Sequence, residues 1–91
     1  MRRSAEWMSQ LDERIIEHLD DEGWASASTM HRSFCFSASE ARIRERCREL
    51  SDAGLIAPIY RRATMYELTA VGMLYLDGDL DAGTLPRRSR C

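Results

Sequence analysis

The sequence contains no lysine. All thirteen of its positively charged residues are arginine, and fifteen acidic residues bring the formal net charge to −2. Basicity carried by arginine alone, beside an excess of acids, fits a GC-rich genome and a salt-loving host whose proteins keep acidic surfaces. This feature of the composition indicates a kind of organism and no particular function.

Long apolar runs are also missing. No stretch approaches the roughly 20 residues that a membrane-spanning helix requires, and the first residues do not have the pattern of a secretory signal peptide. We therefore expect a cytoplasmic protein that does not enter a membrane. A chain of 91 residues provides for one domain with a modest hydrophobic core.

Cysteine is scarce and odd in number. Cys35, Cys47 and Cys91 are widely spaced, which argues against a disulfide framework. His31, Cys35 and Cys47 could approach one another in a folded core and act as metal ligands. Because there is no C-x-x-C motif and no fourth ligand, we expect no metal and no other cofactor. Cys35 is interpreted as a small buried side chain, with a redox role as the alternative.

The charges that are present are unevenly distributed. Residues 6–22 carry seven acids against one arginine, Arg14, whereas residues 32–62 carry seven arginines against four acids. A positive segment within an acidic molecule indicates a site that meets an anionic partner.

Two helices are indicated in the first third of the chain. In residues 9–23 apolar side chains recur at helical spacing, Ser9 is a suitable N-cap with Asp12 at the third position, and Gly23 is suited to end the helix. Residues 26–33 indicate a second, short and weakly patterned helix.

Residues 41–50, ARIRERCREL, present arginine at every second position from Arg42 to Arg48. As a strand, this segment would turn Glu45 and Glu49 toward the core at a high energetic cost. As a helix, it forms a narrow apolar stripe of Ile43, Cys47, Leu50 and Gly54. We therefore predict a helix over about residues 38–53.

The ends of this third helix also have typical signals. Ser37 and Glu40 make an S-x-x-E capping box, and Gly54 is suited to the C-terminal stop. At about 100° per residue, Arg46 lies nearest the apolar stripe. The outer surface then carries the remaining side chains Ala38, Ala41, Arg42, Arg44, Glu45 and Arg48.

After Gly54, two short apolar segments at 55–60 and 65–68 indicate a β-hairpin whose loop carries Arg61 and Arg62. Pro58 cannot donate a ladder hydrogen bond, so its strand must lie at an edge, as in a two-stranded ribbon.

Residues 68–81 indicate a last helix. Thr69 is its predicted N-cap, and Val71, Leu74 and Tyr75 are its predicted buried residues. The final residues, 83–91, contain three arginines and no apolar periodicity, and we expect them to form a flexible basic tail.

This order of elements resembles that of winged helix-turn-helix transcriptional regulators. CRELSDAGLI at 47–56 resembles the end of a recognition helix and the first wing strand, and YELTAVGMLYL at 66–76 resembles the second wing strand and the following helix. The opening segment at 2–23 is similar to the starts of small haloarchaeal and haloarchaeal-phage repressor-like proteins. The resemblance extends over residues 4–82. It implies one mainly α domain with a three-helix core, a small β-hairpin wing and a C-terminal helix.

The resemblance also implies a function. A protein of this kind is expected to be a sequence-specific regulator, and a repressor in particular, that binds double-stranded DNA as a homodimer. The third helix would read the major groove, where Arg42 and Arg48 would bind guanines and Glu45 would accept from a cytosine amine. Ser39 and Arg44 would contact phosphates.

The resemblance also implies that the wing at 61–64 would bring Arg61 and Arg62 to the flanking DNA.

Three apolar side chains remain at the ends of the first helix: Trp7, Met8 and Trp24. They would either close the core or, together with Leu74 and Leu80 of the last helix, form a dimer face.

A second interpretation of the arginines remains open. Each outer arginine has an acid near it on the same helix: Arg42 with Glu45, Arg44 with Glu49, and Arg48 with Asp52. A solvated ion-pair face, in a module that binds a protein partner and no DNA, would give the same local pattern. Arg46, nearest the core, is expected to pair with an acid of the first helix. No nucleophile, base and orienting group can be assembled, so we expect no enzyme.

Overall fold

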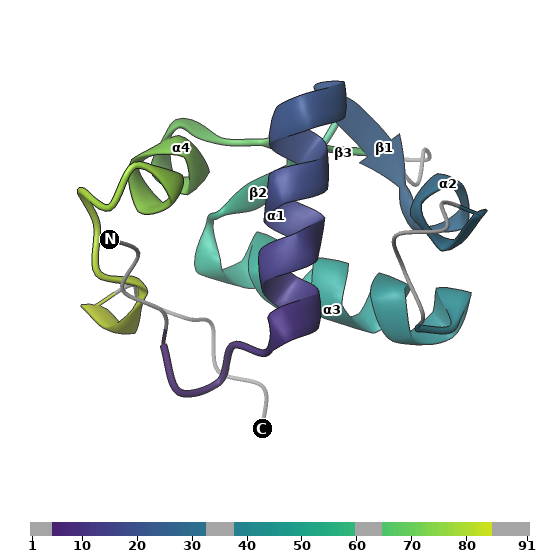
Figure 1. Cartoon of the computed structure of the whole chain (residues 1–91), viewed down its shortest axis with the longest axis horizontal. Coiled ribbons are helices and arrows are strands. Elements are labelled where there is room, and N and C mark those ends of the chain that lie inside the picture. Colours follow the sequence, from purple (N-terminus) through teal and green to yellow (C-terminus); the bar gives the residue numbers. More distant parts are fainter. Residues whose placement is uncertain (1–4, 33–37, 60–64, 85–91) are drawn as a thin grey trace.

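Helix α1 (Gln10–Glu22) runs through the middle of the molecule, with the other elements around it (Figure 1). The computed structural model describes residues 5–32, 38–59 and 65–84. In chain order, the other elements are β1 (Trp24–Ser26), α2 (Ala27–Arg32), α3 (Glu40–Ala53), β2 (Ile56–Pro58), β3 (Met65–Leu68), α4 (Ala70–Leu76) and the 3-10 helix η1 (Ala82–Thr84). None of the described helices is long and apolar enough to cross a membrane.

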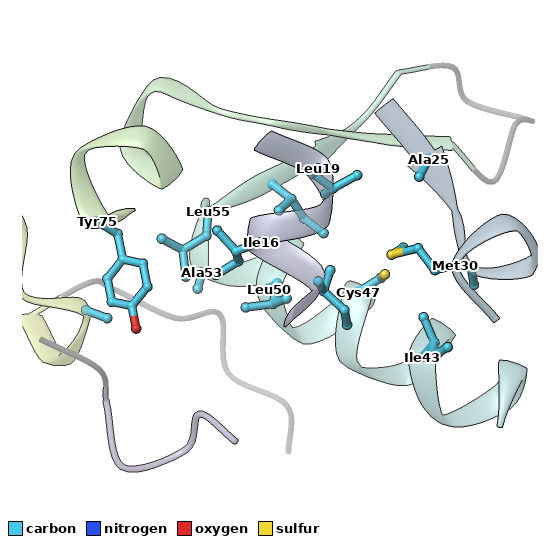
Figure 2. Packing of buried hydrophobic residues seen from close by; sticks show 14 of the residues in the cluster. Ile16, Leu19, Ala25, Met30, Ile43, Cys47, Leu50, Ala53, Leu55 and Tyr75 are labelled. Carbon is cyan, nitrogen blue, oxygen red and sulfur yellow. The ribbon is translucent and has the colours of Figure 1, made fainter. Parts of the chain in front are cut away.

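One hydrophobic core joins the helices and the sheet (Figure 2). Helix α2 lies on one side of α1 and α4 on the other, while α3 crosses α1 at its lower end (Figure 1). The hydrophobic residues of α1–α4 with no more than 1% exposure are Ile15, Ile16, Leu19, Ala27, Met30, Ile43, Cys47, Leu50 and Tyr75. The predicted apolar stripe of α3 is therefore confirmed at Ile43, Cys47 and Leu50, whereas Gly54 lies beyond the end of the helix and is half-buried. Burial of the stripe turns the opposite side of α3 away from the core.

The first and third helices have the predicted type and place. Helix α1 follows Ser9 and ends at Gly23, as the sequence indicates. Helix α3 ends at Gly54, which has the left-handed conformation with φ 88°. The backbone N–H of Gly54 donates to the carbonyl oxygens of Leu50 and Ser51. The predicted capping box with Ser37 is wrong. Ser39 is the N-cap of α3, because its side chain accepts from the backbone N–H of Arg42.

The second helix begins later than predicted because a strand takes the residues before it. Helix α2 starts at Ala27, and the hydroxyl of Ser26 accepts from the backbone N–H of Thr29. Strand β1 pairs antiparallel with β3, with Ala25 opposite Tyr66. The three residues of β1, between Gly23 and α2, are too few to show an alternation of apolar and polar side chains. They form a strand because they pair with β3, which lies about 40 residues further along the chain.

The predicted hairpin is confirmed in its strands. Strands β2 and β3 pair antiparallel, with Pro58 opposite Tyr66, in a sheet of order β1-β3-β2. Pro58 therefore lies on an edge strand, as predicted. The two-stranded ribbon is wrong, because β1 makes the sheet three-stranded. The loop with Arg61 and Arg62 lies outside the described residues.

Helix α4 is fastened to the end of α3 by its N-cap. Thr69 accepts from the backbone N–H of Gly72 at 3.0 Å, and its hydroxyl lies 2.6 Å from the carbonyl of Gly54 and 2.9 Å from that of Leu55. A Cβ on Gly72 would lie 2.3 Å from the Leu55 carbonyl oxygen, so only glycine allows this approach. The predicted cap at Thr69 is confirmed.

The predicted burial on α4 is only partly correct. Tyr75 is fully buried and its hydroxyl donates to Glu13 of α1, whereas Val71 is half-buried. Leu74 was predicted to be buried but is 45% exposed, because Tyr75 and Gly72 take the core-facing side of this short helix. The chain continues into η1, and residues 85–91 lie outside the described part of the molecule.

Candidate nucleic-acid interface

The outward side of α3 carries most of the predicted site residues. Arg42, Arg44, Glu45 and Arg48 are exposed, and so is Ala41 between them. Ala38 was predicted to join them, but it is half-buried and packs against the core. A 14-residue helix anchored on its other side thus presents three guanidinium groups to solvent.

Two of these arginines are held in ion pairs within the helix. Arg42 Nη1 lies 2.6 Å from Glu45 Oε1, as the sequence suggested. Arg44 pairs with Glu40 at 2.6 Å. The suggested pairing of Arg44 with Glu49 is wrong, because residues four apart lie one above the other on a helix whereas residues five apart do not. Both ion pairs are solvent-exposed, so each contributes about 1 kcal/mol or less.

Arg48 differs from the other two. It is exposed, and no carboxylate within residues 5–32, 38–59 and 65–84 lies within ion-pair distance of its guanidinium. The suggested Arg48–Asp52 pair is therefore not formed. Arg48 therefore differs from Arg42 and Arg44 in that its charge can meet another molecule without breaking an ion pair within the described part of the chain.

Ser39 is the N-cap of α3 and is also exposed to solvent. Its oxygen accepts from the N–H of Arg42 at 3.2 Å. A serine hydroxyl that accepts one hydrogen bond still has its own O–H to donate. Ser39 therefore stands at the N-terminus of α3 with a donor directed to solvent or to an anion.

Tyr66 of β3 is half-buried and packs against the core, and the sequence analysis gave it no site role. Burial raises the pKa of its phenol, with a further contribution from Cys47, while Arg48 and Arg44 act in the opposite direction.

Arg46 has a different environment from its neighbours on α3. Its Nε donates to Asp12 Oδ1 and its Nη2 to Asp12 Oδ2, both at 2.8 Å. Nη2 also donates to the carbonyl of Trp7 at 3.0 Å. The Asp12 side chain is fully buried and that of Arg46 is 13% exposed. The prediction that Arg46 pairs with an acid of the first helix is confirmed, and this acid is Asp12.

Asp12 also caps its own helix. Its Oδ2 accepts from the backbone N–H of Ser9 at 2.7 Å and from the Ser9 hydroxyl at 3.2 Å. The hydrogen bonds to Asp12 raise the pKa of Arg46 above its usual value, so the guanidinium remains charged. One carboxylate thereby joins the start of α1, the segment before it and the middle of α3.

The sulfur ligands considered for a metal site are not brought together. Cys47 is buried in the core beside α2 (Figure 2), and burial raises the pKa of its thiol to about 12. The His31 ring contacts the carbonyl of Ala38 through Nδ1 at 3.1 Å, and Cys35 lies outside the described residues. Within the described residues, no group of histidines, cysteines and acids is arranged to hold a metal ion.

The arrangement of a three-helix core, a three-stranded sheet and an arginine-bearing third helix agrees with the comparison with known families. A family model described as winged helix-turn-helix phage repressor matches residues 1–88. The chain belongs to the winged helix-turn-helix phage repressor family. The fold class expected from the sequence is thereby confirmed.

A solved structure supports the same family. The chain is similar to the PhiH1 repressor-like protein from Haloarcula marismortui, with a TM-score of 0.88 and 31% sequence identity over 97% of this chain and 98% of that chain. No curated protein matches the chain. The family is described as a phage repressor and this neighbour as repressor-like.

In this winged helix-turn-helix domain, the Asp12–Arg46 contact should control stability. Asp12→Ala leaves the buried guanidinium of Arg46 without its carboxylate, and we expect the free energy of unfolding to fall by about 3–5 kcal/mol. Glu45→Ala breaks the exposed pair with Arg42 and should cost less than about 1 kcal/mol. Urea unfolding followed by circular dichroism measures both. Equal decreases in the free energy of unfolding of the two variants would contradict the larger contribution that we assign to the buried Asp12–Arg46 pair.

Proposed function

We propose that this protein is a sequence-specific transcriptional regulator, and a repressor, that binds double-stranded DNA through residues 4–82. In this proposal α3 enters the major groove and the hairpin loop at 61–64 contacts the flanking DNA. The family and the repressor-like neighbour support this assignment. The absence of lysine and the organism of that neighbour further support a salt-loving archaeal or viral origin and a cytoplasmic place of action.

The observation that carries the proposal is the exposed guanidinium of Arg48 on the outward side of α3, which forms no ion pair with a carboxylate of the described residues. A helix can enter a major groove only if its outward side is free of other protein, and the exposed side of α3 satisfies this condition within the described residues. Arginine presents two parallel donors that match O6 and N7 of guanine. Arg48 is therefore assigned the main base contact.

Arg42 and Glu45 are assigned a second, shared contact with bases. Their exposed ion pair costs about 1 kcal/mol or less to open, which is less than a bidentate arginine–guanine contact contributes. Once separated, Arg42 can bind a guanine and Glu45 can accept from a cytosine amine. Arg44 and Ser39 are assigned to phosphates, which fix the register of the helix without reading sequence.

For an acidic protein in a salty environment, a small number of contacts to base edges is more suitable than a large number of contacts to phosphates. Attraction to phosphates through counterion release weakens steeply as salt rises, so a surface that relied on many phosphate contacts would bind poorly. Bidentate contacts to base edges depend on geometry at short range and are less affected by screening. The net charge of −2 and the small group of arginines fit this division.

One observation favours a second function. Arg42 and Arg44 are already paired with acids of α3, as expected for a solvated helix surface. Trp24, which is 58% exposed, offers an apolar contact of the kind found at protein interfaces. The alternative is therefore a winged-helix module that binds a protein partner and no DNA.

A first test compares Arg48→Ala with wild type. Duplexes selected from a random pool by the wild-type protein provide the target site. We expect Arg48→Ala to weaken binding to this site by about 1–3 kcal/mol and to relax sequence preference at one base pair. Arg42→Ala should affect a different base pair. Gel-shift titrations on the selected site and its single-base variants measure both effects.

Arg14→Ala is the matched control for charge. Arg14 is an exposed arginine on α1, two residues from Asp12 and thus on the side turned away from α3. The Arg14→Ala substitution removes the same charge as Arg48→Ala and should leave the affinity for the selected duplex nearly unchanged. If no duplex is selected, or if Arg48→Ala and Arg42→Ala both bind like wild type, α3 does not read the groove and the protein-partner alternative is favoured.

A second test concerns the predicted wing. Arg61 and Arg62 lie outside the described residues, and their assignment remains a prediction from sequence. Arg61→Ala/Arg62→Ala should weaken binding to all sequences by similar factors and reduce the slope of affinity against salt by about one per arginine that contacts a phosphate. Titrations at several salt concentrations measure this slope. A loss of sequence preference would contradict the wing assignment.

We also propose that the protein binds DNA as a homodimer, because a single module of this size buries little DNA and two-fold sites are typical of helix-turn-helix proteins. Of the side chains considered for a dimer face, Trp7, Met8 and Leu80 pack against the protein's own core. Leu74 on α4 is 45% exposed, and the adjacent Met73 is 53% exposed. We assign the dimer contact to this side of α4.

This assignment predicts that Leu74→Glu shifts the protein from dimer to monomer, because two charges would meet across the contact. Sedimentation equilibrium measures the change, with circular dichroism as the check that the fold is kept. Trp24→Glu, on the edge strand β1, is the control and should remain dimeric. A wild-type monomer at all concentrations would refute the proposal, and a monomer only in the Trp24 variant would move the contact to β1.

A further inference from the structure

Glu40 is a carboxylate on the part of α3 that the proposed duplex would approach, although no base or phosphate contact is assigned to it. It belongs to the first turn of α3, directly after the N-cap Ser39. Its Oε2 lies 2.6 Å from Arg44 Nη2, and the side chains of Glu40 and Arg44 are 39% and 46% exposed. The carboxylate that holds Arg44 is therefore itself open to solvent.

Two effects keep Glu40 in this place. A carboxylate in the first turn of a helix is favoured by the partial positive charge at the helix N-terminus. In addition, an acid four residues before a basic residue is the favourable order for an ion pair on a helix. Both effects act in the protein without DNA. A phosphate that approaches Arg44 therefore meets a carboxylate that is already there.

Glu45 repeats this arrangement one turn further along α3. Its Oε1 lies 2.6 Å from Arg42 Nη1, and its side chain is 60% exposed. Together with Arg48, which is also exposed, three guanidinium groups and two carboxylates share the outward side of α3. These five groups carry a single net positive charge, although the arginines alone would carry three.

The net charge that a protein brings to DNA determines how its affinity responds to salt. Neutralised phosphates release bound cations, so log affinity decreases with log salt with a slope of about −0.9 for each phosphate that is neutralised. A carboxylate brought to the duplex acts in the opposite direction, because its negative charge retains a cation. The Arg44–Glu40 pair therefore adds almost nothing to the slope, whether or not the pair opens on binding.

We propose that Glu40 and Glu45 reduce the number of cations released when α3 binds its duplex, so that affinity depends only weakly on salt. This inference rests on the proposed function and deepens it, because it gives carboxylates of the interface control over the response to salt. The three outward arginines alone would contribute about −2.7 to the slope, whereas the five groups together contribute about −0.9. Glu45 keeps its charge when it accepts from a cytosine amine, so its two roles are compatible.

Glu40→Gln tests this inference because it removes the charge and keeps the size of the side chain. We expect the slope to become steeper by about 0.9, which is a gain of about eightfold in relative affinity for each tenfold decrease in salt. Single-base variants of the selected duplex should respond by the same factor, since Glu40 is assigned no base. Glu45→Gln should steepen the slope by the same amount. Titrations at several salt concentrations measure the slopes, with circular dichroism at each concentration as the check that the fold is kept.

Glu22→Gln is the matched control. Glu22 is the exposed last residue of α1, whereas α3 crosses α1 near its other end, where Asp12 contacts Arg46 (Figure 1). The rise of a helix places Glu22 about 15 Å beyond Asp12 along α1, which exceeds the Debye length of about 8 Å at physiological salt. The variant loses the same charge as Glu40→Gln and should keep the wild-type slope. An equal change in both variants would overturn the inference, because the slope would then depend on the charge of the whole protein.

Combining Glu40→Gln with Arg44→Ala tests the role of the pair. Arg44→Ala alone should make the slope shallower by about 0.9, and Glu40→Gln/Arg44→Ala should return it to the wild-type value, because both charges of the pair are then absent. A wild-type slope in Glu40→Gln, or a double variant that keeps the steep slope of Glu40→Gln, would overturn the inference and leave the proposed function standing. Absence of any duplex binding by wild type would overturn both.

Discussion

The buried contact between Asp12 and Arg46 is the constraint on which the arrangement of the site depends. A buried carboxylate is tolerated only when its oxygens are satisfied. In Asp12, Oδ1 accepts from Arg46, and Oδ2 accepts from both Arg46 and Ser9. Arg46 in turn holds the carbonyl of Trp7. Because both charges are removed from water, neither helix can rotate or slide without exposing an uncompensated group. The angle at which α3 crosses α1 is therefore set by a polar contact as well as by apolar packing.

This contact divides the arginines of α3 into two kinds. Arg46 is used by the protein for its own fold, whereas Arg42, Arg44 and Arg48 remain on the solvent side. The exposed pairs that Arg42 and Arg44 make with Glu45 and Glu40 are weak enough to be exchanged for another anion. A regulator built in this way has a helix whose position is strongly determined and whose surface charges can still change partner, a combination that suits recognition of a groove.

The second anchoring of α3 lies at its C-terminal end. Thr69 contacts the carbonyls that follow α3, and Gly72 lets α4 approach the Leu55 carbonyl closely. Strand β2 follows α3 closely along the chain, and β3, which pairs with β2, leads into Thr69. The C-terminal end of α3 is therefore joined both to the sheet and to α4.

Local patterns in the sequence determined the four helices, the hairpin strands, the glycine that ends α3 and the pairing of Arg46 with an acid of α1. Each follows from spacing along the chain, from capping chemistry or from the cost of burying a charge. Only the tertiary structure decided that Trp24–Ser26 forms a strand, that Ser39 caps α3, that Leu74 is exposed and that Arg44 pairs with Glu40. Strand pairing and burial depend on partners distant in the sequence. The choice between Ser37 and Ser39 as N-cap depends on where the preceding segment enters the helix, and the choice of Glu40 over Glu49 depends on which acid lies one turn from Arg44. The place of Tyr66 opposite Ala25 and Pro58 belongs to this second class, because the register of a three-stranded sheet is a property of all its strands together.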